Sequence, residues 1–130
     1  MSMGKSATPL GKVRGLGSAQ HGGGHWIEER FYSLALVLLT LWLLFSLMML
    51  PALDRATVVE WLRAPAGAVP MALFILAAFK HGFDGMKVFV DDYVHDGGNL
   101  LATHFILKMA AVAGAALSLF ALAKIAFGAA

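Results

Sequence analysis

The chain has 130 residues, of which 59% are hydrophobic and only 14% are charged, and its mean hydropathy is +0.74. Soluble domains carry about 25% charged residues, so this composition predicts a membrane protein. The formal net charge of +2 gives no support for nucleic acid binding. Because the sequence contains no cysteine, it excludes a disulfide, a covalent c-type haem attachment and a thiolate-held iron–sulfur cluster within this chain.

The N-terminal 30 residues are rich in glycine and lack the apolar core of a signal peptide, which predicts a cytoplasmic segment that orders against a partner. A charge-free stretch follows and predicts a first membrane helix at about residues 31–50. Four bases precede this helix and two follow it in the 51–65 loop: Lys5, Lys12, Arg14 and Arg30, then Arg55 and Arg63. Since cytoplasmic segments carry an excess of Lys and Arg, we expect the N-terminus in the cytoplasm.

Two further apolar stretches predict membrane helices at about residues 66–90 and 104–127, with a loop at 91–103 between them. Each is long enough to cross a hydrocarbon core about 30 Å thick, which needs roughly 20 helical residues. His104, at the start of the last helix, is expected to be an interfacial side chain. The sequence therefore predicts an all-α membrane protein with an anchor domain over residues 31–130. Its interior is too small to favour an independent enzyme, so we expect a role with partners.

The stretch "FKHGFDGMKVFVDDYVHD", residues 79–96, concentrates polar side chains at the end of the second predicted span. At the helical spacing i, i+4, i+7, i+11 it forms two stripes. One stripe is His81, Gly85, Val88 and Asp92, and the other is Lys80, Asp84, Lys87 and Asp91. The second stripe alternates in charge, so its members can neutralise one another on a face covered by solvent or protein.

His81 lies about 18 Å from Tyr93 along a regular helix, which is too deep to reach head-group water easily. An imidazole at that depth needs a hydrogen-bond partner, a proton path or a metal. Gly82 and Gly85 flank it and remove side chains, so a flat group or another helix can approach closely. Haem ligation and simple helix packing both fit this pattern.

At the end of the same helix, Tyr93 follows Asp92 at the depth of a quinone head group. A phenolic hydroxyl can donate a hydrogen bond to a quinone carbonyl, and the carboxylate of Asp92 can hold or orient that hydroxyl. Tyrosines also occur at this depth simply as interfacial anchors. The spacing of these residues fits both interpretations.

The motif "H-G-x-x-G-x-x-x-x-x-D-D-Y" from His81 to Tyr93 resembles the second-helix motif of the succinate dehydrogenase hydrophobic membrane anchor subunits, the smaller of the two cytochrome b556 chains. Residues 8–30, "TPLGKVRGLGSAQHGGGHWIEER", look like the N-terminal segment of the alphaproteobacterial members. The resemblance covers essentially the whole chain. One departure is "ERFYS" in place of the family's usual "QR-x-T-A", which alters the packing expected around Arg30.

This resemblance implies that the three helices form a bundle with a second membrane anchor, the cytochrome b anchor subunit, and that the two chains share one haem b. His81 would be an axial ligand of the haem iron, and the partner would supply the other. Gly82 and Gly85 would admit the haem to the helix. Arg30 would lie near a haem propionate, where a guanidinium suits a carboxylate.

The resemblance also implies that Tyr93 and Asp92 bind ubiquinone and that the anchor docks an iron–sulfur subunit and a flavoprotein subunit. The complex would be succinate:ubiquinone oxidoreductase, with this chain as a subunit that has no independent activity. The family resides in the bacterial inner (plasma) membrane. Two alternatives remain open: an anchor of a quinol:fumarate reductase, and a small haem-free transporter subunit that uses Lys80, His81 and Asp84 as a polar pathway.

Overall fold

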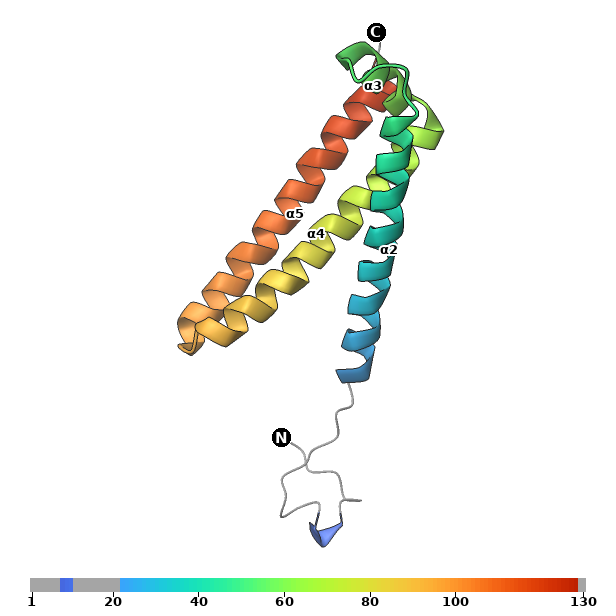
Figure 1. The fold of residues 1–130 in the computed structure, drawn as a ribbon. Coiled ribbons are helices and arrows are strands. Elements are labelled where there is room, and N and C mark those ends of the chain that lie inside the picture. The colour runs from blue at the N-terminus through green and yellow to red at the C-terminus, as the bar shows by residue number, and fades with distance from the viewer. Residues whose placement is uncertain (1–7, 11–21, 129–130) are drawn as a thin grey trace.

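The computed structural model describes residues 8–10 and 22–128, and it confirms the all-helical class predicted from composition. Its four long or medium helices are α2 (Gly22–Met48), α3 (Arg55–Arg63), α4 (Pro65–Tyr93) and α5 (Gly97–Phe127) (Figure 1). Residues 1–7 and 11–21, which make up most of the predicted cytoplasmic segment, lie outside the described residues.

Helix α4 is central, because it packs against each of α2, α3 and α5. Figure 1 shows α4 and α5 as a long hairpin, with α2 alongside the first part of α4 and α3 at the end opposite the hairpin turn. Few side chains are buried within this single chain: the buried hydrophobic residues of the described ranges are Ala77, Val90 and Leu122. The large apolar surface that remains is suited to lipid or to partner helices.

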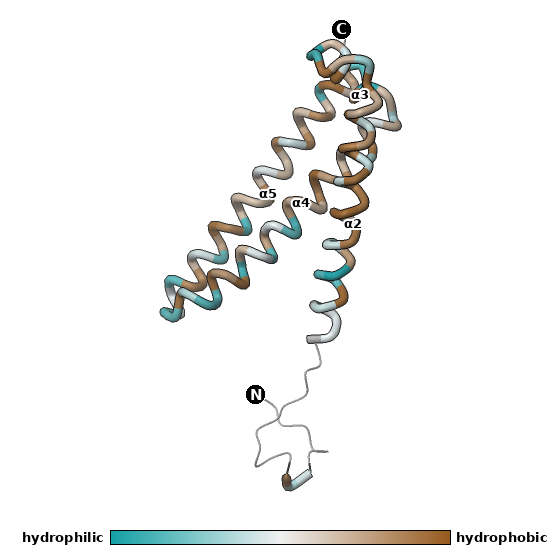
Figure 2. The backbone as a smooth tube through the Cα atoms, viewed as in Figure 1, coloured by the Kyte–Doolittle hydropathy of each residue, from teal (hydrophilic) through white to brown (hydrophobic). Residues whose placement is uncertain are grey.

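Three helical segments are long and apolar enough to cross a membrane: Trp26–Met48, Pro65–Tyr93 and Gly97–Phe127. The chain is therefore a multi-pass membrane protein. At 1.5 Å per residue the 29 residues of α4 span about 43 Å and the 31 residues of α5 about 46 Å, more than the roughly 30 Å of a hydrocarbon core. Figure 2 shows hydrophilic residues near the turn between α4 and α5 and along the N-terminal part of α2. At these places the helices can extend beyond the hydrocarbon core.

The helices differ from their predicted bounds mainly at polar ends. The first helix begins at Gly22 rather than at residue 31, because the polar turn that precedes the charge-free stretch continues the same helix. The predicted loop at 91–103 is wrong, since α4 runs to Tyr93 and α5 already begins at Gly97. Asp96 caps α5 by accepting a 2.9 Å hydrogen bond from the backbone N–H of Asn99, which offsets the low helix propensity of two glycines.

A short helix, α3, occupies part of the predicted 51–65 loop. Asp54 caps it by accepting a 2.8 Å hydrogen bond from the Thr57 backbone N–H, and this bond lowers the pKa of the Asp54 carboxyl. Trp61 stacks on Trp42 of α2 with ring centroids 5.6 Å apart. Helix α3 therefore joins the ends of α2 and α4.

The connection from α3 into α4 depends on Gly67. A Cβ atom there would lie 3.0 Å from the Trp61 carbonyl carbon and closer still to its oxygen, and both atoms belong to the backbone. We expect Gly67→Ala to destabilise the protein by about 1 to 3 kcal/mol, because the backbone of one helix must shift. The measurement is the thermal unfolding midpoint in detergent. The matched control is Gly98→Ala, where the new methyl meets only an ordinary 3.5 Å contact; equal midpoints for the two variants would contradict this account.

Candidate functional site

His81 lies on the side of α4 that approaches α2, and its ring lies beside the Ser33 side chain. The Ser33 hydroxyl donates a 2.8 Å hydrogen bond to the Glu29 carbonyl oxygen, so its single hydrogen is already used. His81 Nδ1 lies 3.5 Å from Ser33 Oγ. A hydrogen on His81 Nδ1 would point at this hydroxyl oxygen, and the ring would then keep its lone pair on Nε2. A metal-ligating histidine uses this tautomer, in which the second nitrogen donates to a protein oxygen.

The face of α4 next to His81 is uncovered in this chain. His81, Gly82 and Gly85 are all exposed, and a Cβ atom added at either glycine would meet no other atom within 4 Å. An imidazole with a free Nε2 beside two side-chain-free positions leaves room for a flat group against the helix. The residues present thus fit haem, and they also fit a closely packed helix of a partner subunit.

The charged stripe on the neighbouring face of α4 is neutralised within the chain. Lys80 Nζ lies 2.5 Å from Asp84 Oδ2 on its own helix and 3.2 Å from Glu28 Oε1 on α2. The same ammonium sits over the Tyr32 ring at 5.1 Å. Asp84 is only 7% exposed, so its carboxylate depends on this pairing to remain buried. The cluster holds α2 against α4 one residue from His81.

Arg30 is exposed on α2, and its guanidinium lies 5.2 Å from the centre of the Trp26 ring. It precedes Ser33 by three residues, so the two side chains share one side of α2. No contact joins Arg30 to His81 within the described part of the chain. Helix packing brings Ser33, rather than Arg30, against the histidine.

At the C-terminal end of α4, Asp92 and Tyr93 are both exposed, and the Tyr93 ring packs on Phe89 with centroids 4.6 Å apart. The phenol is 71% exposed, so its hydroxyl is available to an external acceptor. Asp91 points elsewhere: its Oδ1 lies 2.9 Å from His104 Nε2 on α5. The two adjacent carboxylates therefore have different surroundings.

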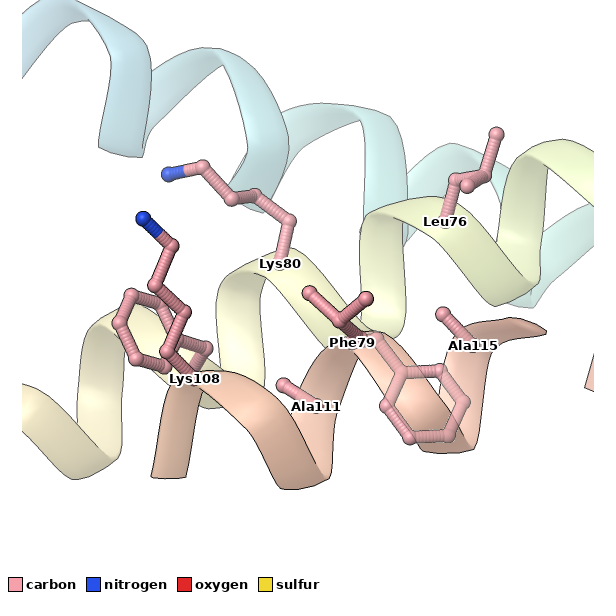
Figure 3. Close-up of a pocket in the computed structure, with 8 residues that line it drawn as sticks. Leu76, Phe79, Lys80, Lys108, Ala111 and Ala115 are labelled. Carbon is pink, nitrogen blue, oxygen red and sulfur yellow. The ribbon is translucent and has the colours of Figure 1, made fainter. Parts of the chain in front are cut away.

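A groove of about 350 Å³ runs between α4 and α5, with Lys80 and Lys108 at one end and Leu76 and Ala115 toward the other (Figure 3). The predicted site residues do not line it. A second groove of about 310 Å³ between the same helices includes Gly82. Phe79, Phe83 and Ala111 line both grooves.

Two contacts of these sites were missed by the sequence analysis. Ser33 had no distinguishing motif, although its spacing from Arg30 places it on the same side of α2. His104 is predicted to be an interfacial side chain, and its contact with Asp91 is a further feature that the sequence did not reveal. A contact between residues on different helices leaves no trace in the periodicity of either one.

The model of the succinate dehydrogenase/fumarate reductase transmembrane subunit family matches residues 4–123. Among curated proteins, the succinate dehydrogenase hydrophobic membrane anchor subunit of Rickettsia bellii is 30% identical over 83 residues, which cover 64% of this chain and 66% of that protein. The subunit of the same name from Paracoccus denitrificans is 29% identical over 124 residues, 94% of each chain.

The chain thus spans slightly less than two thirds of the Rickettsia bellii relative and nearly all of the Paracoccus denitrificans relative. No solved structure gives a significant match. The alignment with Paracoccus denitrificans extends over all the predicted site residues, since only a few residues at the chain ends fall outside its 94% coverage.

Proposed function

Because the chain belongs to the succinate dehydrogenase/fumarate reductase transmembrane subunit family, we propose that it is the hydrophobic membrane anchor of a bacterial succinate:ubiquinone oxidoreductase. It resides in the inner (plasma) membrane with its N-terminus in the cytoplasm, beside a second anchor chain that completes the bundle. The exposed apolar surface of the single chain supports such a partner. On the cytoplasmic side it docks an iron–sulfur subunit and a flavoprotein subunit.

The observation that carries this proposal is the environment of His81. Its Nδ1 faces Ser33, and its Nε2 is left beside two glycines whose surfaces are open. These residues fit haem b, which His81 Nε2 would help to hold together with a residue of the partner subunit. When bound, the haem accepts and releases single electrons. Arg30, on the same side of α2 as Ser33, suits a haem propionate once its guanidinium leaves the Trp26 ring.

Tyr93 and Asp92 bind ubiquinone at the cytoplasmic end of α4. The Tyr93 hydroxyl donates a hydrogen bond to a quinone carbonyl, which stabilises the negative charge that develops on that oxygen during reduction. Asp92, exposed beside it, orients the hydroxyl. Two electrons from succinate reach the quinone through the soluble subunits, and two protons enter from the cytoplasmic side.

Isolation of the chain with its natural partners tests this function. We expect an affinity-tagged chain to bring down an iron–sulfur protein and a flavoprotein, to show a b-type haem spectrum on reduction, and to reduce ubiquinone with succinate. A colourless protein without these subunits would contradict the proposal and favour a haem-free polar pathway. The pairing of Lys80 with both Glu28 and Asp84 already weighs against such a pathway, because the charges neutralise one another.

The same preparation decides the direction of the reaction. A flavoprotein that reduces fumarate with quinol faster than it oxidises succinate would assign the chain to a quinol:fumarate reductase. The family model covers transmembrane subunits of both enzymes, whereas the curated relatives named above are succinate dehydrogenase subunits. We therefore expect succinate oxidation to be faster.

A further inference from the structure

Helices α4 and α5 are linked near their shared turn by one polar contact. His104 Nε2 lies 2.9 Å from Asp91 Oδ1, and the approach falls outside the angles of a regular hydrogen bond. An imidazole lone pair facing a carboxylate at this distance would be repulsive, so Nε2 must carry a hydrogen. The attraction is therefore that of a buried imidazole N–H, on a side chain that is 23% exposed, for a carboxylate.

The contact lies beside the proposed quinone site. Asp91 is followed directly by Asp92 and Tyr93, and α4 ends at Tyr93. On a regular helix Asp91 and Asp92 point about 100° apart, so engagement of Asp91 by α5 leaves Asp92 on the open side. The negative end of the helix dipole repels the two adjacent carboxylates in the last turn of α4. The attraction of His104 for Asp91 offsets part of this unfavourable electrostatic energy.

We infer that Asp91 and His104 form a latch that positions Tyr93 and Asp92 for ubiquinone, with His104 as a positioning residue. This inference rests on the proposed function. The connection between the helices is only residues 94–96, and Asp96 is fixed as the cap of α5. The contact of Asp91 with His104 then fixes the position of the last turn of α4 relative to α5. In residues 22–128, His104 is the basic group within ion-pair distance of Asp91.

The test uses the assembled complex and compares His104→Ala with His95→Ala. His95 is the matched control, because it lies in the same hairpin and forms no ion pair within the described residues. We expect His104→Ala to raise the KM for ubiquinone about two- to fivefold, the scale of a partly exposed ion pair, with a smaller change in kcat. Succinate oxidation with a dye that accepts electrons before the membrane, and the haem spectrum, should stay unchanged.

Two further variants separate positioning from general disruption. His104→Gln retains a donor N–H for Asp91 and should restore most of the wild-type KM. Asp91→Ala removes the oxygen that faces His104 and should raise the KM as His104→Ala does, and it decides the question if the His104 variant assembles poorly. Asp91→Ala and His104→Ala should be non-additive, because each removes the same contact.

A wild-type KM in His104→Ala, an equal KM in His95→Ala, or additive effects in the double variant would overturn the latch. Tyr93→Phe distinguishes this failure from a failure of the proposed function. If Tyr93→Phe slows quinone reduction and His104→Ala does not, only the latch is wrong. If neither variant affects quinone reduction, the quinone site itself is wrong.

Discussion

His81→Ala is expected to abolish or strongly reduce haem b binding in the assembled complex. The substitution removes the imidazole whose Nδ1 lies 3.5 Å from Ser33 Oγ, and with it the Nε2 atom proposed to hold the haem. Neither Gly82 nor Gly85 can supply a ligand, and the Ser33 hydroxyl already donates to a backbone oxygen. The measurement is the reduced-minus-oxidised spectrum, with haem expressed per complex.

Some loss of assembly is expected with the haem, because a bound cofactor stabilises the folded state by linkage. The control is His95→Ala, the same change at an exposed position in the hairpin connection, which should keep the full haem content. Unchanged b-type absorption in His81→Ala would remove this residue from the set of haem ligands. Equal haem loss in both variants would instead indicate general damage to the bundle.

Tyr93→Phe is expected to slow ubiquinone reduction about ten- to a hundredfold while haem stays bound. The substitution keeps the ring, its packing on Phe89 and its interfacial anchoring, and it deletes only the hydroxyl. A hydrogen bond to an oxygen on which charge develops contributes about 1.5 to 3 kcal/mol, which corresponds to this loss of rate. The measurement is the succinate-driven rate with ubiquinone.

The control acceptor is a dye that takes electrons before the membrane, and its rate should be nearly unaffected. The control variant is Tyr32→Phe, the same change at a ring that packs against Lys80 rather than at the end of α4. Wild-type ubiquinone kinetics in Tyr93→Phe would identify this residue as an interfacial anchor only. Equal losses with both acceptors would indicate misassembly.

The sequence alone determined that this is an all-helical membrane protein and which stretches of the chain form its membrane helices. A chain that is 59% hydrophobic with three apolar stretches leaves membrane helices as the stable arrangement, because the backbone polar groups must be satisfied internally. Helical spacing also placed His81 with Gly85 and Asp92 on one face of a single helix. The family was recognised from this motif, and the comparisons confirm it. The roles of His81, Arg30, Asp92 and Tyr93 remain predictions.

The helix ends were harder to predict, because hydropathy reports the hydrocarbon core and not the polar turns beyond it. Residues 97 and 98 fall in the predicted 91–103 loop, and the Asp96 cap instead begins α5 there. Helix α3 was missed for a similar reason: its nine residues are too few and too polar to register as a span.

Only the tertiary structure decided which residues meet. Periodicity assigns a side chain to a face of its own helix, whereas the helix that covers this face depends on how the helices cross. Ser33 meets His81 across 48 positions of sequence, Glu28 meets Lys80, and His104 meets Asp91. Each contact joins two helices, and the hydrophobic periodicity of either helix would be the same without it. Such contacts are therefore decided by how the helices pack in the bundle and cannot be read from the order of the residues.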